Sequence, residues 1–206
     1  MRADIRLWTA IALIGICGFS VTRGWVIVHF SFAMANPDSS EKRDEIINSW
    51  SSVPEVASAA LQAELREKID ISDQKAANSR REALSSILSI KPLSSVDWLS
   101  LSGWQLVTDQ PMEQVFESLE LSMVTGPNEG YVKAERGIFG VSLWLRLSAD
   151  LKRRVATDLA AGEIIGNEKL RAALSAQPAR VRNELQAAML ATGLSPNEVE
   201  RRLGFQ

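Results

Sequence analysis

The stretch LELSMVTGPNEGYVKAERG, residues 119–137, places two glycines, a proline and an asparagine between two apolar, helix-like runs. The spacing of Gly126 and Gly130 suits a loop that cradles a phosphate, and it suits a turn between two helices equally well. The stretch lacks the Gly-Lys-Ser/Thr ending of a P-loop, and no apolar strand precedes it. We therefore interpret it as a turn in which Gly126 ends one helix and Asn128 caps the next.

The chain on both sides of this turn has the pattern of short helices. Proline and glycine fall mainly between stretches with apolar residues at helical spacing, such as residues 54–69 and 111–124. Ser72, Ser148 and Ser195 precede three of these stretches and are predicted N-caps. No stretch alternates with period two for long enough to predict a strand. We expect an all-α domain of seven to nine helices over residues 45–206.

One part of this domain has a regular order of small and large residues: Leu99, Ser102, Gly103, Leu106, Val115, Leu119, Ser122 and Pro127. The order resembles one tetratricopeptide repeat over residues 99–127, with Ser102 and Val115 as atypical occupants, and a partial second unit to about residue 161. The resemblance implies that Gly103 lets two antiparallel helices approach closely and that Pro127 ends the second one. An unrelated helical bundle with similar spacing remains the alternative.

The N-terminus has the pattern of a membrane segment. Residues 7–21 carry no charge, Arg2 and Arg6 precede them, and the apolar character continues to Ala35. About 20 apolar residues are needed to span a bilayer, and the stretch from Leu7 to Trp25 is nearly that long. We therefore predict a single transmembrane signal anchor over residues 1–35, followed by a polar linker over residues 36–44.

Three residues serve as anchor markers in this prediction. Trp8 and Trp25 lie about 25 Å apart along a helix, close to the separation of the two aromatic belts, and Arg23 lies near the outer belt. Two other interpretations stay open: a signal peptide cleaved after Ala35, and a buried hairpin of the folded domain. The N-terminal arginines favour a cytoplasmic N-terminus, so we expect a bacterial inner-membrane protein whose helical domain faces the periplasm or outside.

Charge and composition exclude several classes of function. The net charge of −2 argues against nucleic-acid binding, which normally requires a concentrated basic surface. Residues 36–150 nevertheless carry 11 basic and 18 acidic side chains, whereas residues 151–206 carry 9 and 6. The single cysteine, Cys17, and the single histidine, His29, both lie in the apolar N-terminus. The remaining residues therefore offer no zinc site, thiol nucleophile or Ser-His-Asp triad, and we expect no metal and no cofactor.

We accordingly expect a membrane-anchored, non-enzymatic protein that binds or scaffolds a protein partner. It looks like small anchored helical accessories of bacterial envelope and surface-polysaccharide assembly. Two alternatives stay open: an enzyme acting on an envelope polymer through carboxylates such as Glu113 and Glu117, and a structural subunit of a larger membrane complex. The tryptophans of the domain are expected to pack in the core or, where exposed, to contact a partner. The predicted partner-binding residues of the hairpin and its groove are Trp98, Leu101, Trp104, Phe116, Leu119 and Tyr131.

Overall fold

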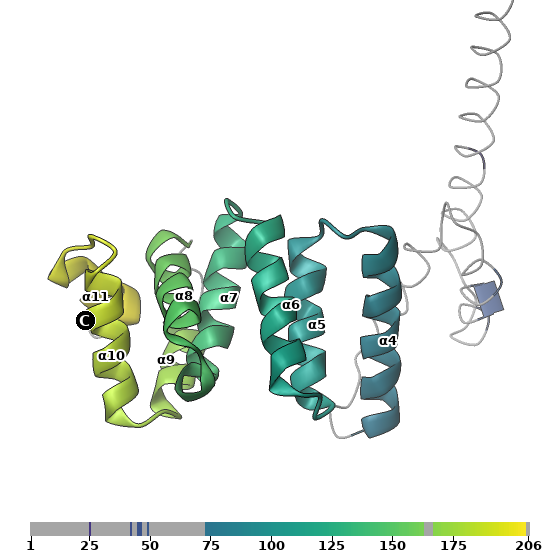
Figure 1. The fold of residues 1–206 in the computed structure, drawn as a ribbon, viewed down its shortest axis with the longest axis horizontal. Helices are drawn as coiled ribbons and strands as arrows, with labels where there is room; N and C mark the ends of the chain where they lie inside the picture. The colour runs from purple at the N-terminus through teal and green to yellow at the C-terminus, as the bar shows by residue number, and fades with distance from the viewer. Residues whose placement is uncertain are drawn as a thin grey trace, which may run out of the picture. The chain divides into compact units, whose positions relative to one another are not determined.

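The computed structural model describes residues 73–162 and 167–204, together with Trp25, Lys42, Glu45, Ile46 and Ser49. Over these residues the chain forms eight α-helices and one short 3-10 helix, with no strand, so the predicted all-α class is confirmed for them. The helices, shown in Figure 1, are α4 (Gln74–Ile90), α5 (Ser95–Val107), α6 (Met112–Thr125), α7 (Gly130–Ser142), η1 (Trp144–Arg146), α8 (Ala149–Ala161), α9 (Asn167–Ser175), α10 (Ala179–Leu190) and α11 (Pro196–Leu203).

The chain divides into two compact units, Met1–Lys91 and Pro92–Gln206. The first contains α4, and the second contains α5 to α11. The predicted anchor over 1–35 and the linker over 36–44 lie outside the described residues, except for Trp25 and Lys42. None of the helices built from described residues is long and apolar enough to cross a membrane.

Side-chain caps begin several of these helices. Ser148 accepts a hydrogen bond from the backbone of Leu151, and Ser195 accepts one from Glu198, so both predicted caps are confirmed. The predicted cap at Ser72 is wrong by one residue. Asp73 caps α4 instead, because its carboxylate accepts hydrogen bonds from two backbone N–H groups at the start of the helix, at 3.0 and 3.1 Å.

Helices α5 and α6 form an antiparallel hairpin held by two buried serines. The Ser102 hydroxyl donates to the Val115 carbonyl, and the Ser122 hydroxyl donates to the Ser95 carbonyl, each at 2.7 Å. The first bond joins the middle of α5 to the start of α6, and the second joins the start of α5 to the end of α6. This order of pairing fixes the antiparallel arrangement. It also explains why serine occupies position 102, where the repeat motif has a large apolar residue.

Helices α7 and α8 form a second antiparallel pair, and here glycines allow the close approach. A methyl group added at Gly137 would lie 2.5 Å from the Leu159 side chain, and one added at Gly140 would overlap Val155. Gly103, in contrast, has nothing within 4 Å of where its methyl group would be. The prediction that Gly103 brings two helices together is therefore wrong, because serines hold that pair and glycines hold the next one.

The core of the second unit runs across α6 to α11. Trp144 is its largest apolar member and is only 1% exposed, which confirms core packing for this tryptophan. Helix α7 contacts α9, and α8 contacts α10, so later helices pack on the α7–α8 pair in chain order, as Figure 1 shows. The buried residues of this core include Val141, Leu151, Val155, Leu159, Leu170, Leu174, Val181, Leu185, Met189, Val199 and Leu203.

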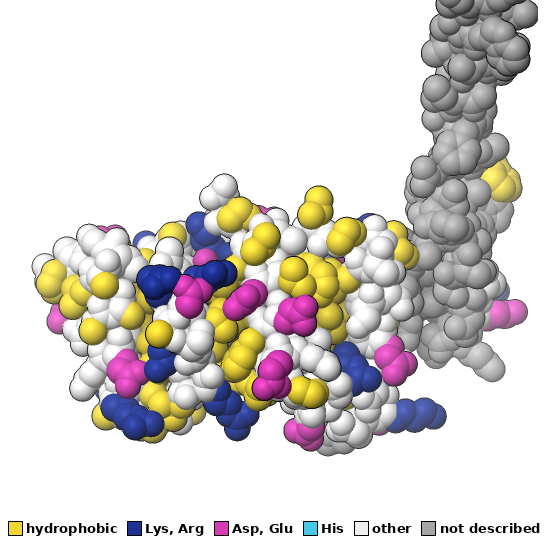
Figure 2. All heavy atoms as spheres, viewed as in Figure 1, with side chains coloured by type: hydrophobic (Ala, Val, Ile, Leu, Met, Phe, Trp, Pro, Cys, Tyr) yellow, Lys and Arg dark blue, Asp and Glu magenta, His cyan; other side chains and the backbone are white. Residues whose placement is uncertain are grey.

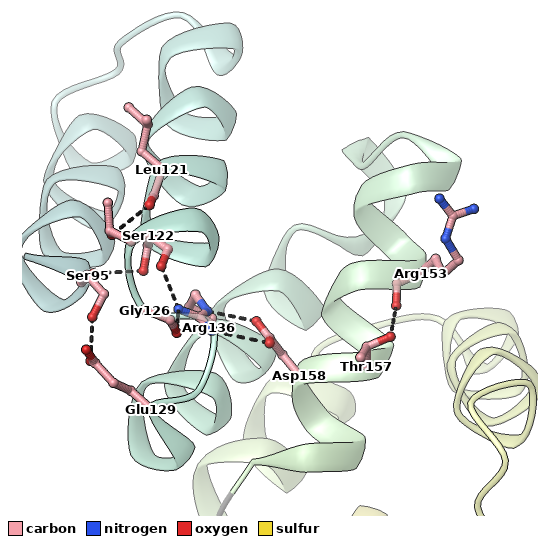
Figure 3. Close-up of polar contacts among 10 residues, drawn as sticks. Ser95, Leu121, Ser122, Gly126, Glu129, Arg136, Arg153, Thr157 and Asp158 are labelled. Carbon is pink, nitrogen blue, oxygen red and sulfur yellow. Dashed lines mark hydrogen bonds and ion pairs between the residues drawn. The ribbon is translucent and has the colours of Figure 1, made fainter. Parts of the chain in front are cut away.

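The turn between α6 and α7 follows the sequence prediction in part. Gly126 is the C-cap of α6, as predicted, and its N–H donates to the Ser122 carbonyl. The N-cap of α7 is Glu129, so the predicted cap at Asn128 is wrong. The Glu129 carboxylate instead accepts a hydrogen bond from the Ser95 hydroxyl at 2.5 Å, as Figure 3 shows. This contact ties the start of α7 to the start of α5.

Candidate partner-binding groove

A groove of about 290 Å³ lies between α5 and α7. On each helix the lining residues lie mostly three or four positions apart, because residues at that spacing share one face of a helix. Helix α5 contributes the side near its N-terminus, and α7 contributes most of its length. The lining residues are Val96, Leu99, Ser100, Tyr131, Val132, Glu135 and Phe139.

The groove is apolar and open to solvent at its mouth. Val96 is 48% exposed and Tyr131 is 51% exposed, whereas Val132 is buried. Leu99 and Phe139 are half-buried between these extremes. Large apolar side chains that stand half in water are what a binding groove offers to a partner, because a partner that covers them removes apolar surface from water.

Glu135 is the charged residue of the lining, and it is paired across to another helix. Its carboxylate accepts a hydrogen bond from Lys169 Nζ of α9 at 2.9 Å. This hydrogen bond, together with the charge of Glu135, raises the pKa of Lys169 above its ordinary value. Both side chains reach solvent, so water or another ion can replace this contact, and the pair contributes little to the stability of the fold.

The wall formed by α7 is held in place by a buried arginine. Arg136 is fully buried, and its guanidinium donates from Nε to Asp158 Oδ2 at 2.8 Å and from Nη2 to Oδ1 at 3.3 Å. Its Nη1 donates to the carbonyls of Ser122 and Gly126 at 2.7 and 3.1 Å. Figure 3 shows the side chain reaching from α7 to the end of α6 on one side and to α8 on the other.

This arrangement satisfies a charge that is costly to bury. The forked, two-bond contact is a strong geometry for an arginine–carboxylate pair, and the two carbonyls accept from Nη1. Burial raises the pKa of the Asp158 carboxyl, against the opposing effect of the hydrogen bonds and charge of Arg136. Three helices thus meet at one side chain, and α7 cannot move relative to α6 or α8 without breaking charged hydrogen bonds.

Among the predicted partner-binding residues, Tyr131 lines the groove. Leu101 and Leu119 are 5% and 0% exposed, so these two belong to the core and present no surface to a partner. Trp98 and Trp104 are half-buried outside the groove lining, and the Trp98 indole N–H donates to the Pro92 carbonyl at 2.7 Å. Phe116 is half-buried against the core of the second unit.

The predicted anchor residues Trp8 and Arg23 lie outside the described residues. Trp25 is helical and 65% exposed.

Sequence reasoning missed most of the lining, namely Val96, Leu99, Ser100, Val132, Glu135 and Phe139. On α7, Tyr131, Glu135 and Phe139 repeat every four residues, which predicts a common helix face. The sequence does not say which helix faces them. That neighbour begins 35 residues earlier, at Ser95, and is brought there by tertiary packing.

The carboxylates proposed for catalysis lie elsewhere. Glu113 and Glu117 are exposed on α6, and so is Glu120 one turn further on. None of the three lines the groove between α5 and α7. Within residues 73–162 and 167–204, no group of three or more His, Cys, Asp or Glu side chains is arranged to hold a metal ion.

Comparison of the chain with protein-family models, with curated proteins and with solved structures found no match.

Proposed function

We propose that this chain is a non-enzymatic interaction protein that holds a segment of a partner protein in the groove between α5 and α7. One observation carries the proposal: apolar side chains from two helices stand half-exposed around a single open groove. Such a lining gains free energy when a partner covers it.

The order of the helices supports a repeat of hairpins. Helices α5 and α7 begin 35 residues apart, at Ser95 and Gly130, and each is followed by an antiparallel partner. The second pair differs by carrying η1 between its helices. In a stacked array of hairpins, the first helices of successive pairs lie side by side and their shared face is the working surface.

The apolar N-terminus supports attachment to a membrane. We propose that residues 1–35 anchor the chain as a single span and that the helical domain works outside the cytoplasm, as an accessory of envelope or surface-polysaccharide assembly. Alkaline carbonate extraction and protease accessibility of spheroplasts test this. We expect the full chain to stay with the membrane and to be digested only when the outer side is exposed.

Photo-crosslinking of the full-length protein, expressed in the cells that naturally produce it, tests whether a partner binds in the groove. We place p-benzoylphenylalanine at Tyr131 and, as a control, at Leu145 of η1, which is exposed to a similar degree. A partner in the groove yields a specific adduct at position 131 and none at position 145. The adduct is lost when Val96→Asp is added, because a carboxylate in the apolar lining must be desolvated by the partner.

Two results would contradict binding of the partner in the groove. An adduct at position 131 that survives Val96→Asp, or the same adduct at position 145, means that the groove does not select the partner. Leu145→Asp is the matched variant for Val96→Asp, because it introduces the same charge at a similarly exposed apolar side chain outside the lining. It is expected to leave the adduct at position 131 unchanged.

A further inference from the structure

The part of the second unit that carries the groove is markedly acidic. Residues 92–132 contain six acidic side chains and no lysine, arginine or histidine. All six are exposed or partly exposed, and they are Asp97, Asp109, Glu113, Glu117, Glu120 and Glu129. On the face drawn in Figure 2, the region over α5 and α6 shows acidic and hydrophobic side chains, whereas the basic ones lie mostly toward α8 to α10.

The acidic groups include the immediate surroundings of the groove. Asp97 follows the lining residue Val96, Glu129 begins α7, and Glu135 is itself in the lining. The nearest basic residues do not offset this. Arg136 is buried and paired with Asp158, and Lys133 and Lys169 are two charges against the three carboxylates of Asp97, Glu129 and Glu135. A basic partner is therefore attracted to the mouth of the groove, and an acidic partner is repelled.

The size of the groove limits what enters it. A volume of about 290 Å³ is at the lower end of the range for sites that enclose a whole small molecule. It suits one or two large apolar side chains of a bigger partner. On α7 the lining extends from Tyr131 to Phe139, which corresponds to about 12 Å or two helical turns. An amphipathic helix presents apolar side chains at this interval and keeps charged ones on its other face.

We propose that the occupant of the groove is a short amphipathic helix of a partner protein, with large apolar residues on one face and lysine or arginine on the other. This proposal rests on the proposed function and adds the chemistry of the partner. The apolar face fills the lining, and the cations of the occupant meet the carboxylates at the mouth. One of these cations replaces Lys169 on Glu135, since the Lys169 side chain is 64% exposed and that of Glu135 is 24% exposed.

Three synthetic peptides test the proposal. Each peptide is about fourteen residues long, or roughly four helical turns, and has leucines along one face. The polar positions are all lysine in the first peptide, all glutamate in the second and all serine in the third. Each is labelled and titrated by fluorescence anisotropy with the full chain in discs of zwitterionic lipid, and empty discs serve as the blank. We expect the lysine peptide to bind at least about tenfold more tightly than the glutamate peptide at low salt, with the advantage shrinking as salt screens the charges.

Two variants locate the effect. Val96→Lys is expected to abolish the binding of the lysine peptide, because it adds a like charge to the apolar lining, whereas Leu145→Lys leaves it unchanged. Glu135→Gln is expected to weaken binding about twofold to fivefold, as for loss of one charge at the rim of an interface. Glu200→Gln removes the same charge from an exposed position on α11 and is the matched control, with no expected change.

Three other outcomes would contradict the proposed occupant, and each points to a different cause. If the glutamate or serine peptide binds as tightly as the lysine peptide and Val96→Asp abolishes that binding, the groove is a binding site but its occupant is not basic. If no peptide binds while the photo-adduct at Tyr131 forms, the proposed function stands and the partner chemistry proposed here is wrong. If light scattering shows self-association of the chain that Val96→Asp abolishes, the occupant is a second copy, whose residues 151–206 carry the opposite net charge.

Discussion

The two helical hairpins that form the groove are built from different chemistry. The α5–α6 pair is held by two serine hydroxyls that donate to backbone carbonyls, and its helices carry acidic side chains on their surface. The α7–α8 pair is held by close contact at Gly137 and Gly140, and by a buried arginine–aspartate pair. The same antiparallel geometry is thus reached with neutral polar bonds in one pair and with glycine packing and charge in the other.

The comparison shows where rigidity is concentrated. Arg136 joins the end of the first hairpin to both helices of the second, so it carries the position of α7 relative to α6. The serines act only within the first hairpin. Substitutions in the second pair are therefore expected to cost more stability than those in the first.

The largest loss is expected for Arg136→Met. The change leaves Asp158 buried without its cation and removes the donors that meet two carbonyls of α6. Removing one partner of a buried ion pair costs about 3–5 kcal/mol. Urea unfolding of the full chain, followed by circular dichroism, measures the change. The double variant Arg136→Met/Asp158→Leu is expected to regain a large part of the loss, because no charge is then left buried. A double variant no more stable than Arg136→Met would contradict this explanation.

Glycine-to-alanine substitutions are expected to have opposite effects on stability in the two hairpins. Gly140→Ala is expected to cost about 1–3 kcal/mol, because the added methyl group overlaps Val155 across the α7–α8 contact. Gly103→Ala in α5 meets open space and is expected to stabilise by up to about 1 kcal/mol through helix propensity. Thermal unfolding of the two variants gives the sign of each effect. Adding Val155→Ala to Gly140→Ala supplies the space and is expected to lessen the loss.

Most of the helices in the described part of the chain could be predicted from sequence for a local reason. Apolar periodicity, serine caps and proline or glycine breaks all act within a few residues. The caps at Ser148 and Ser195 and the end of α6 at Gly126 are of this kind. The predicted caps at Ser72 and Asn128 each miss by one residue: Asp73 caps α4 with its side chain, whereas Glu129 takes the N-cap position of α7 without a side-chain cap.

The groove and the arginine could not be predicted in the same way, because each depends on contacts between distant residues. Arg136 lies four residues after Val132 and four before Gly140, so it occupies the buried face of α7. A charge on an apolar face implies a buried partner, and this pattern was available in the sequence. Its partner Asp158 follows the buried Val155 by three residues, but only the fold brings the two faces together.

The positions of the tryptophans depend on tertiary packing for a related reason. Large aromatic residues are common in interfaces, which favoured Trp98 and Trp104 as contact residues. In the structure Trp98 and Trp104 lie outside the groove, and its apolar lining consists of valine, leucine, tyrosine and phenylalanine side chains of α5 and α7. The choice between a core and a surface position depends on which face each helix turns to its neighbours, and composition alone does not determine that.

Serine substitutions in the first hairpin are expected to have smaller effects. Ser102→Ala and Ser122→Ala each remove a buried hydrogen bond of 2.7 Å between α5 and α6 and are expected to cost about 1 kcal/mol each. Ser142→Ala is the matched control, because its hydroxyl is exposed and donates only within its own helix. A cost for Ser142→Ala equal to that of the other two would mean that the inter-helix bonds are not the cause.

The smallest effect is expected from a contact between α10 and the second hairpin. The Glu184 carboxylate accepts hydrogen bonds from the Trp144 indole N–H at 2.9 Å and from Lys152 Nζ at 3.0 Å. These bonds, first that of Trp144 and then that of Lys152, lower the pKa of Glu184. A lowered pKa in the folded state gives stability that is present above the ordinary pKa of a glutamate and is lost as the pH falls through the lowered value.

Thermal unfolding between pH 7 and pH 3 tests this contribution. Glu184→Gln keeps an acceptor oxygen near Trp144 and cannot titrate, so the variant is expected to be slightly less stable than the parent at pH 7. The difference is expected to shrink as the pH falls, because the parent loses its charged contact while the variant has none to lose. If the gap between the two proteins stays constant over this range, the charge of Glu184 adds nothing, and the contact at Trp144 is that of a neutral acceptor.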